Sequence, residues 1–363
     1  MSSRRKSQPQ SRKSKPTEQA GKPQGANRFR PKPKHAKAQK PVEAVAGPKR
    51  APHAKRVGAR PAFAAPTIIE TPNNSHFALL DSGHGRKLER YGEMTIIRPE
   101  AQAIWPPALP QRAWDKADAV FTGDLDEEGA GRWRFRDEGS GETWPLEVDG
   151  VGYFGRFTAF RHVGVFAEQT AHWRDMAERI NAAGETHDRP IKVLNLFGYT
   201  GVASLYAAAH GAHVTHVDAS KKAIGWAREN QTLGGLDDMP IRWICEDAMK
   251  FVEREGRRGN TYDIILADPP AYGRGPNGEV WQLFDDLPDL LAGCRALLSA
   301  DALMMTLTAY AIRASLFAVH EIMMETMTGH APAGTVTSGE LILRDEAVGR
   351  ALSTSMFSRW TPS

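Results

Sequence analysis

Four turns between residues 195 and 272 carry side chains that could bind a ligand or hold a reacting group. They read N-L-F-G-Y-T-G (195–201), V-D-A-S (217–220), E-D-A-M (246–249) and D-P-P-A-Y (268–272), and each follows an apolar, strand-like run. In a sheet of parallel strands the carboxyl ends lie at one edge, where ligands of the nucleotide type bind. The spacing therefore predicts one binding cleft built from four strand ends.

The most specific of these turns is D-P-P-A-Y. Pro269 and Pro270 fix the backbone and remove two N–H groups, so the Asp268 side chain and the Pro269 carbonyl can accept hydrogen bonds from an amine. Tyr272 can stack on a flat ring. A methyl group on a sulfonium ion is already electrophilic, so an enzyme needs mainly to align acceptor, methyl and sulfur. The turn therefore indicates methyl transfer to a planar nitrogen heterocycle, with a proline-rich turn of no catalytic use as the alternative.

The first turn fits a ligand that has no diphosphate. Gly198 and Gly201 allow close approach of the backbone before a helix predicted at 202–210. Nicotinamide and flavin enzymes carry G-x-G-x-x-G at this place, whereas this turn has only G-x-x-G, and no G-K-[ST] of a P-loop follows. Asn195 and Tyr199 remain available for polar contacts.

Two acids follow the next strands. Asp218 can accept hydrogen bonds from vicinal ribose hydroxyls. Asp247 can accept from an adenine amine, with Ala248 and Met249 as an apolar wall for the ring. Each acid could instead cap a helix, although Ser220 is better placed than Asp218 for that role.

Strand-like and helix-like runs alternate from Lys192 onward, which predicts an α/β fold with a doubly wound, mostly parallel sheet. Seven strands are expected, the last two (ELILRD and TSMFSRW) as an antiparallel pair. Glycine-bearing turns between short runs indicate a small β-rich domain at 66–165, whose aromatic residues are assigned to its core rather than to base stacking. We therefore expect a disordered basic arm at 1–65, this small domain, and a larger domain at 166–363.

Charge is divided unevenly along the chain. Residues 1–60 carry 18 Lys and Arg against two acids, whereas the rest carries 29 basic and 41 acidic side chains. The arm has too few large apolar residues to offset the entropy lost on ordering. Clustered cations release counterions from phosphates, so we interpret the arm as a tether for RNA, with a solubilising tail as the alternative.

In order and spacing, N-L-F-x-Y-T-G, V-D-x-S, E-D-A and D-P-P-x-Y resemble the turns of class I S-adenosylmethionine-dependent methyltransferases. The resemblance is to the bacterial 23S ribosomal RNA cytosine-5 and guanine methyltransferases, and it covers roughly residues 150–360. It implies a Rossmann-like fold, S-adenosyl-L-methionine as cofactor, and RNA, chiefly large-subunit ribosomal RNA, as partner. Within that range, the segment HVGVFAEQTAHW (162–173) resembles a segment that contributes to the cofactor pocket in that family. The acceptor would lie against Asp268, Pro269, Pro270 and Tyr272. The implied cofactor pocket consists of Gln169, Asn195, Phe197, Gly198, Tyr199, Thr200, Gly201, Asp218, Ala219, Ser220, Asp247, Ala248 and Met249.

One departure from that family changes the expected chemistry. Methylation of cytosine carbon 5 needs a Cys thiolate that adds to the ring. The family carries this Cys after the D-P-P or at the end of the next strand, but those places read DPPAYGR and MMTLTAY here. Cys245 and Cys294 are badly placed for it. We therefore expect methylation of a nitrogen, either an exocyclic amine or a ring nitrogen of a purine.

Other classes of function stay open. A methyltransferase for protein or small molecules, a non-catalytic RNA-binding assembly factor, and, by fold alone, a nicotinamide-dependent dehydrogenase are the alternatives. No apolar run reaches the roughly 18 residues of a membrane span, and no secretory signal is evident. His210, His213 and His216 cannot converge from one strand, so we expect no metal site. With only two cysteines, a cytoplasmic location is expected.

Overall fold

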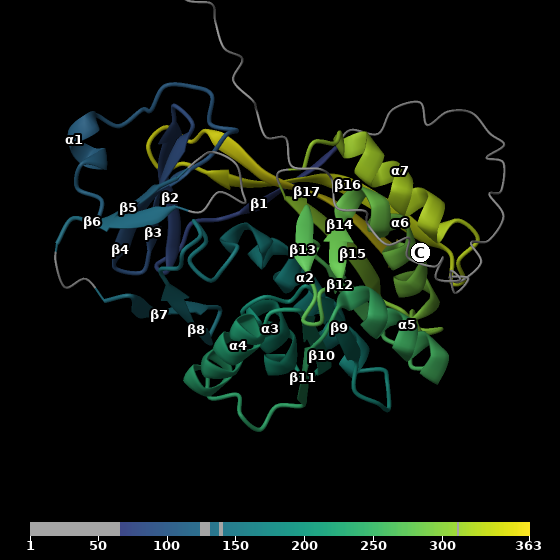
Figure 1. Ribbon diagram of the computed structural model, residues 1–363. Helices are drawn as coiled ribbons and strands as arrows, with labels where there is room; N and C mark the ends of the chain where they lie inside the picture. The colour runs from purple at the N-terminus through teal and green to yellow at the C-terminus, as the bar shows by residue number, and fades with distance from the viewer. Residues whose placement is uncertain (1–65, 124–130, 138–140, 311) are drawn as a thin grey trace, which may run out of the picture. The chain divides into compact units, whose positions relative to one another are not determined.

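An eight-stranded sheet carries the four turns at its carboxyl edge (Figure 1). The computed structural model describes residues 66–123, 131–137, 141–310 and 312–363, and the basic arm predicted at 1–65 lies outside the described residues. The order of strands is β1-β16-β17-β15-β12-β9-β10-β11. Their bounds are β1 (Thr67–Thr71), β9 (Lys192–Leu196), β10 (His213–Asp218), β11 (Ile241–Cys245), β12 (Ile264–Ala267), β15 (Met304–Tyr310), β16 (Gly334–Arg344) and β17 (Ala351–Pro362).

The order of strands creates the crevice that the sequence predicts. Strand β9 pairs in parallel with β10 on one side and with β12 on the other, so the chain reverses its direction of progress across the sheet at β9. Such a switch point opens a crevice at the carboxyl ends of the strands. β12 continues in parallel to β15, whereas β17 is antiparallel to both β15 and β16.

Helices cover both faces of this sheet, because its strands are apolar on both sides. Val193 and Ile264 point into one core, together with α2 and α3, whereas Leu194 and Ile265 point into the other, together with α5, α6 and α7. The helical segments are η1 (Ala167–Gln169), α2 (Thr170–Gly184), α3 (Val202–Ala209), α4 (Lys221–Leu233), α5 (Ala248–Arg258), α6 (Leu283–Ala296) and α7 (Leu316–Met327).

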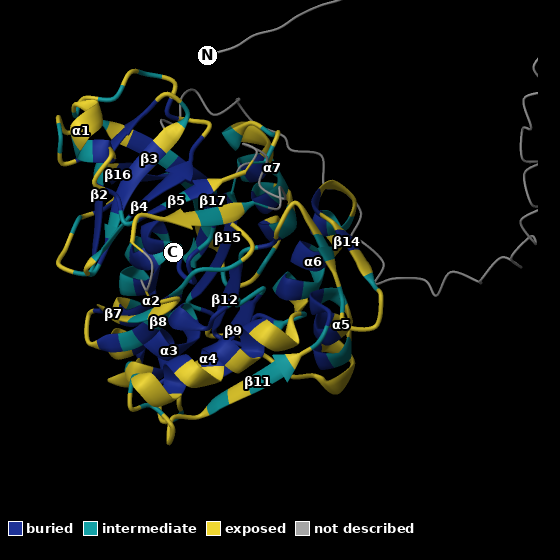
Figure 2. Ribbon diagram, turned by 60° about the vertical axis from the view of Figure 1, so that its left-hand side comes forward, coloured by how far each residue is buried: buried dark blue, intermediate teal, exposed yellow. Residues whose placement is uncertain are grey.

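The β-rich part that precedes the large sheet contains a five-stranded sheet and a hairpin. The five-stranded sheet, called the small sheet below, has the order β2-β3-β4-β5-β6. Phe77, Leu79 and Tyr153 share one core with Met176 of α2, so this part packs on the large sheet (Figure 2). The small sheet also has a smaller apolar cluster of its own, formed by Leu88, Ile97, Trp114 and Ala117. Its elements are β2 (Phe77–Gly83), β3 (Arg86–Tyr91), β4 (Met94–Pro99), α1 (Gln111–Trp114), β5 (Ala119–Thr122), β6 (Arg132–Phe135), β7 (Thr143–Val148) and β8 (Val151–Arg156).

The predicted α/β fold with an N-terminal β-rich part is confirmed, and all seven predicted strands are present. The eighth strand, β1, pairs in parallel with β16 at the edge of the large sheet, far from its neighbours in sequence. The domain boundary proposed at 165 stays a prediction. Among the helices in the described part of the chain, none has both the length and the apolar character needed to cross a bilayer.

Candidate active site

The four turns meet around one cavity of about 440 Å³ at the carboxyl edge of the large sheet. The segment 160–173, which runs through η1 into α2, closes its other side. Most of the residues singled out from sequence lie in the wall of this cavity. They are Gln169, Asn195, Phe197, Gly198, Tyr199, Thr200, Asp218, Ala219, Ser220, Asp247, Ala248, Asp268, Pro269, Pro270 and Tyr272.

The first turn, between β9 and α3, has an unusual backbone. Phe197 and Tyr199 adopt positive φ angles of 56° and 52°, a region that residues with side chains rarely enter. Gly198 lies between them, and a Cβ there would come within 2.3 Å of the His216 ring. Non-glycine residues in this region cluster at ligand-binding sites, since the surrounding structure must hold them there.

A chain of buried hydrogen bonds stabilises the turn between β9 and α3. The Asn195 side-chain amide donates to Ser204 Oγ at 2.9 Å, and Ser204 Oγ lies 3.0 Å from Nδ1 of His216. Burial lowers the pKa of His216 to about 3, so its ring is neutral. Asn195 therefore both lines the cavity and ties β9 to α3 and β10.

Thr200 anchors the same turn to the opposite side of the cavity. Its hydroxyl donates to the Gly164 carbonyl at 2.5 Å, and its own carbonyl accepts from the Asn230 side chain at 2.9 Å. The turn is thereby fixed to the segment that leads into η1.

Asp218 binds the backbone of two turns at once. Its carboxylate accepts from the Tyr199 N–H at 2.9 Å and from the Ser220 N–H at 2.7 Å. Burial raises the pKa of Asp218, and these two hydrogen bonds oppose the rise. Each carboxylate oxygen keeps a second lone pair, so the group can still accept from ligand hydroxyls. Ser220 caps α4 by accepting from the Ala223 N–H, as predicted.

Asp247 both caps a helix and faces the cavity. Its side chain accepts from the Lys250 N–H at 3.0 Å at the start of α5, and Ala248 lies beside it in the wall. Two predicted pocket residues lie elsewhere. Met249 packs against the core that α5, α6 and α7 share with the large sheet, and it is not in the cavity wall. Gly201 has a φ of 79°, and a Cβ added there would come within 3 Å of Ala227 and Trp243.

The D-P-P-A-Y turn is held by an aromatic residue that sequence reasoning missed. The indole N–H of Trp281 donates to the Pro270 carbonyl at 2.7 Å, and its ring lies 5.1 Å from that of Phe197. Trp281 belongs to β14 (Val280–Gln282), which pairs with β13 (Tyr272–Arg274). Tyr272 is 39% exposed at the rim of the cavity, with the Arg274 guanidinium 5.9 Å from its ring.

Gln169 lies between the end of β12 and strand β15 and contacts a side chain from each. Its amide nitrogen donates to Asp268 Oδ2 at 3.0 Å, and its amide oxygen accepts from the Thr308 hydroxyl at 3.4 Å. The resemblance places Gln169 in the cofactor pocket, and the structure brings it into contact with the acceptor turn. Thr308 belongs to β15, so the bridge crosses from η1 to two neighbouring strands.

The comparisons with known proteins agree with this geometry. A family model described as S-adenosylmethionine-dependent methyltransferase matches residues 124–328. The crystal structure of a SAM-dependent methyltransferase from Agrobacterium tumefaciens is 60% identical, with a TM-score of 0.78. The match covers 85% of this chain and 97% of that one.

Curated relatives match more distantly. Ribosomal RNA large subunit methyltransferase K/L from Shewanella frigidimarina is 30% identical over 228 residues, which is 58% of this chain and 30% of the relative. Ribosomal RNA large subunit methyltransferase K from Neisseria meningitidis is 25% identical over 228 residues, which is 60% of this chain and 61% of the relative. The chain therefore spans less than two thirds of either relative.

The cavity fits S-adenosylmethionine. Its volume lies within the range of roughly 300–1,000 Å³ that small-molecule sites occupy. Asp218 would accept from ribose hydroxyls and Asp247 from an adenine amine, and Phe197 and Ala248 would supply apolar surface in the same wall. The cofactor would supply a methyl group made electrophilic by its sulfonium.

Proposed function

This chain belongs to the S-adenosylmethionine-dependent methyltransferase family, and from that premise we propose that it methylates a base nitrogen of RNA, with large-subunit ribosomal RNA as the target. Two curated relatives are named for large-subunit ribosomal RNA, which supports the choice of substrate. The basic arm has an excess of Lys and Arg that could neutralise an RNA phosphate backbone, whereas the remainder of the chain is acidic. We expect the enzyme to act in the cytoplasm.

The position of the cysteines carries the nitrogen assignment. Attack on carbon 5 of a pyrimidine needs a thiolate beside the base. Both cysteines are described, and neither lines the cavity. Cys294 is fully buried in α6, and burial raises the pKa of its thiol to about 12. The Cys245 thiol donates to the Ala219 carbonyl at 3.6 Å, beside the turn that ends β10. An exocyclic amine or ring nitrogen of a purine is nucleophilic without such help.

The acceptor turn supplies the groups that a nitrogen acceptor needs. The Asp268 carboxylate would accept a hydrogen bond from the target amine and receive the proton that the nitrogen loses as the N–C bond forms. The Pro269 carbonyl would orient a second N–H. The Gln169 amide donates to Asp268 Oδ2 at 3.0 Å and so helps to orient the carboxylate toward the amine. Tyr272 would cover the base at the rim.

Transfer of a radiolabelled methyl group tests this proposal. RNA from a strain that lacks the gene is incubated with the protein and labelled S-adenosylmethionine, and digested nucleosides are identified by mass spectrometry. Label in a purine nucleoside, lost in Asp268→Ala and kept in Asp238→Ala, is the expected result. Asp238 is exposed after α4 and does not line the cavity, so it controls for loss of an acidic side chain.

Three outcomes would contradict the proposal. Label in carbon 5 of a pyrimidine would reject the nitrogen assignment. Label in protein or in small molecules, with none in RNA, would show that the enzyme methylates protein or small molecules instead of RNA. Cofactor binding without transfer to any acceptor would favour the assembly factor.

A further inference from the structure

Three rings in the wall of the cavity have no role in the proposed function so far: His162, Phe166 and Tyr310. The ring centroids lie 4.8 Å apart for His162 and Phe166, 6.0 Å for Phe166 and Tyr310, and 6.2 Å for His162 and Tyr310. Each residue is only partly buried. These rings therefore form one aromatic wall, which we call the ring wall. It offers a flat heterocycle faces on which to stack.

Polar side chains in the wall of the same cavity point to a ligand with a hydrogen-bonding edge. His172, Thr306 and Ser355 are 2%, 2% and 5% exposed and all line the cavity. Both ring nitrogens of His172, the Thr306 hydroxyl and the Ser355 hydroxyl have no hydrogen-bond partner among the residues that the structure describes. Ser355 lies directly opposite Tyr310 in the pairing of β17 with β15. Buried polar groups in native proteins nearly always have partners, and the polar edge of a ligand would supply them here.

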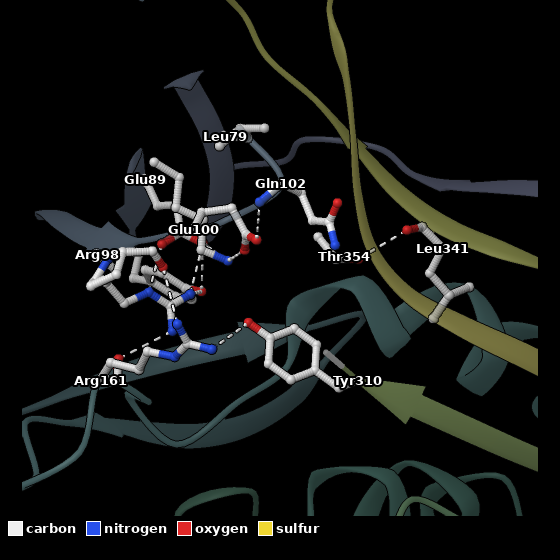
Figure 3. Close-up of polar contacts among 12 residues, drawn as sticks. Leu79, Glu89, Arg98, Glu100, Gln102, Arg161, Tyr310, Leu341 and Thr354 are labelled. Atoms are coloured by element: carbon white, nitrogen blue, oxygen red, sulfur yellow. Dashed lines mark hydrogen bonds and ion pairs between the residues drawn. The ribbon is translucent and has the colours of Figure 1, made fainter. Parts of the chain in front are cut away.

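The small sheet holds the ring wall in place through a chain of buried charges (Figure 3). The Arg161 guanidinium donates to the Tyr310 hydroxyl at 3.2 Å and lies 5.7 Å from the centre of its ring. Arg98 donates to the Arg161 carbonyl at 3.2 Å and to both carboxylate oxygens of Glu89 at 2.7 Å. The side chains of this Arg98–Glu89 pair are 7% and 1% exposed. The Arg161 guanidinium also donates to the Pro99 carbonyl of β4 at 3.4 Å, so the small sheet contacts both the backbone and the side chain of Arg161.

We propose that the ring wall and its polar neighbours form the subsite for the target base. The base stacks on the face of Tyr310 and meets Phe166 at an angle, because the planes of these two rings are 61° apart. It turns a hydrogen-bonding edge toward His172 and Ser355. Arg161 acts as a positioning residue that holds Tyr310. This inference rests on the proposed function, since it says where the base of that reaction binds.

The chemistry of the subsite selects a nucleobase over other parts of RNA. Stacked rings recognise a planar heterocycle, whereas a phosphate calls for cations and a sugar for hydroxyl partners. Burial lowers the pKa of His172 to about 3, so its neutral ring has one N–H donor and one acceptor nitrogen. A base edge carries the same mixture of donors and acceptors. The base must leave its stack to enter the cavity, so the ligand is a single unstacked nucleotide.

Two substitutions at one position test the stacking. Tyr310→Leu removes the ring, whereas Tyr310→Phe keeps it and removes only the hydroxyl that Arg161 contacts. We expect KM for RNA to rise about 5- to 150-fold in Tyr310→Leu, the loss of one stacked base. Tyr310→Phe should stay closer to the unaltered enzyme, and calorimetry should give an unchanged Kd for S-adenosylmethionine in both. Phe317→Leu, at a 63% exposed ring on α7 outside the cavity, is the control.

Ser355→Ala tests the polar edge with a change too small to unfold the chain. We expect kcat/KM for RNA to fall about fivefold, as for one lost hydrogen bond, with the cofactor Kd unchanged. A cofactor Kd that rises together with KM would assign the ring wall to the cofactor and overturn the proposal, as would an unchanged KM for RNA in Tyr310→Leu. Absence of transfer to RNA by the unaltered enzyme would instead reject the proposed function.

Discussion

Gly198, in the turn after β9, lies so close to His216 that we expect Gly198→Ala to destabilise the protein. An added Cβ would be 2.3 Å from Cε1 and 2.5 Å from Nδ1 of the His216 ring, and 3.0 Å from the amide nitrogen of Asn195. Unstrained carbon atoms stay about 3.5–4.0 Å apart, so Gly198→Ala requires a shift of more than about 1 Å.

His216 has little room to make that shift. It is fully buried, its ring lies 4.7 Å from that of Trp243, and Nδ1 is 3.0 Å from Ser204 Oγ. Overpacking costs about 1–3 kcal/mol, and an unpaired buried hydrogen-bonding group costs about 1–3 kcal/mol more. Gly198→Ala should therefore lower the free energy of unfolding by about 2–6 kcal/mol. A shift of the turn in Gly198→Ala would also move the Tyr199 N–H away from the Asp218 carboxylate that accepts from it. We therefore expect the cofactor Kd to rise at least about tenfold.

Urea unfolding without cofactor and calorimetric titration with cofactor measure the two effects. Gly225→Ala is the control, because its added Cβ meets nothing within 4 Å and α4 should gain about 0.5–1 kcal/mol. His216→Ala in the same background makes room for the methyl group. A double-mutant cycle should therefore give a coupling energy of at least about 1 kcal/mol. A Gly198→Ala protein with normal stability and affinity, or a cost that does not depend on His216, would refute the reasoning.

Three further predictions concern the cavity wall. Gln169→Ala removes the amide that donates to Asp268 at 3.0 Å, so single-turnover methyl transfer at saturating cofactor should slow by about 10- to 150-fold, and an unchanged rate would remove Gln169 from the site. Trp281→Phe deletes the N–H that donates to the Pro270 carbonyl in the D-P-P-A-Y turn. We expect kcat to fall, while the free energy of unfolding decreases by only about 1 kcal/mol. A kcat equal to that of the unaltered enzyme would contradict this role of Trp281. Burial lowers the pKa values of His172 and His216 from 6.5 to about 3. Below pH 6.5 the unfolded chain therefore binds more protons than the folded one, and the free energy of unfolding decreases as the pH is lowered. At pH 5 each should cost about 2 kcal/mol relative to pH 7, and His172→Phe should make the decline in the urea midpoint less steep; a midpoint that does not change between pH 7 and 5 would contradict both shifts.

Interactions over long distances in sequence could not be predicted. β1 pairs with β16 more than 260 residues away, and the Arg161–Tyr310 contact joins residues 149 apart. Neither partner has a local pattern that names the other, because such pairs depend on how the elements pack. The sequence does contain one usable signal for Tyr310, since this residue ends the strand next to the one that Asp268 follows, and strand ends at a switch point line the crevice.

The sequence by itself determined the alternation of strands and helices, the seven strands, and the turns that face the cavity. These follow from local causes: apolar runs need burial, glycines permit close approach, and two prolines fix a turn. Only the tertiary structure decided what each residue touches. It placed Gly201 and Met249 outside the cavity wall. A Cβ on Gly201 would meet Ala227 of α4 and Trp243 of β11, and Met249 packs against the core that α5, α6 and α7 share with the large sheet. It also joined Gln169 to Asp268, since a side-chain hydrogen bond between distant segments exists only once the chain is packed.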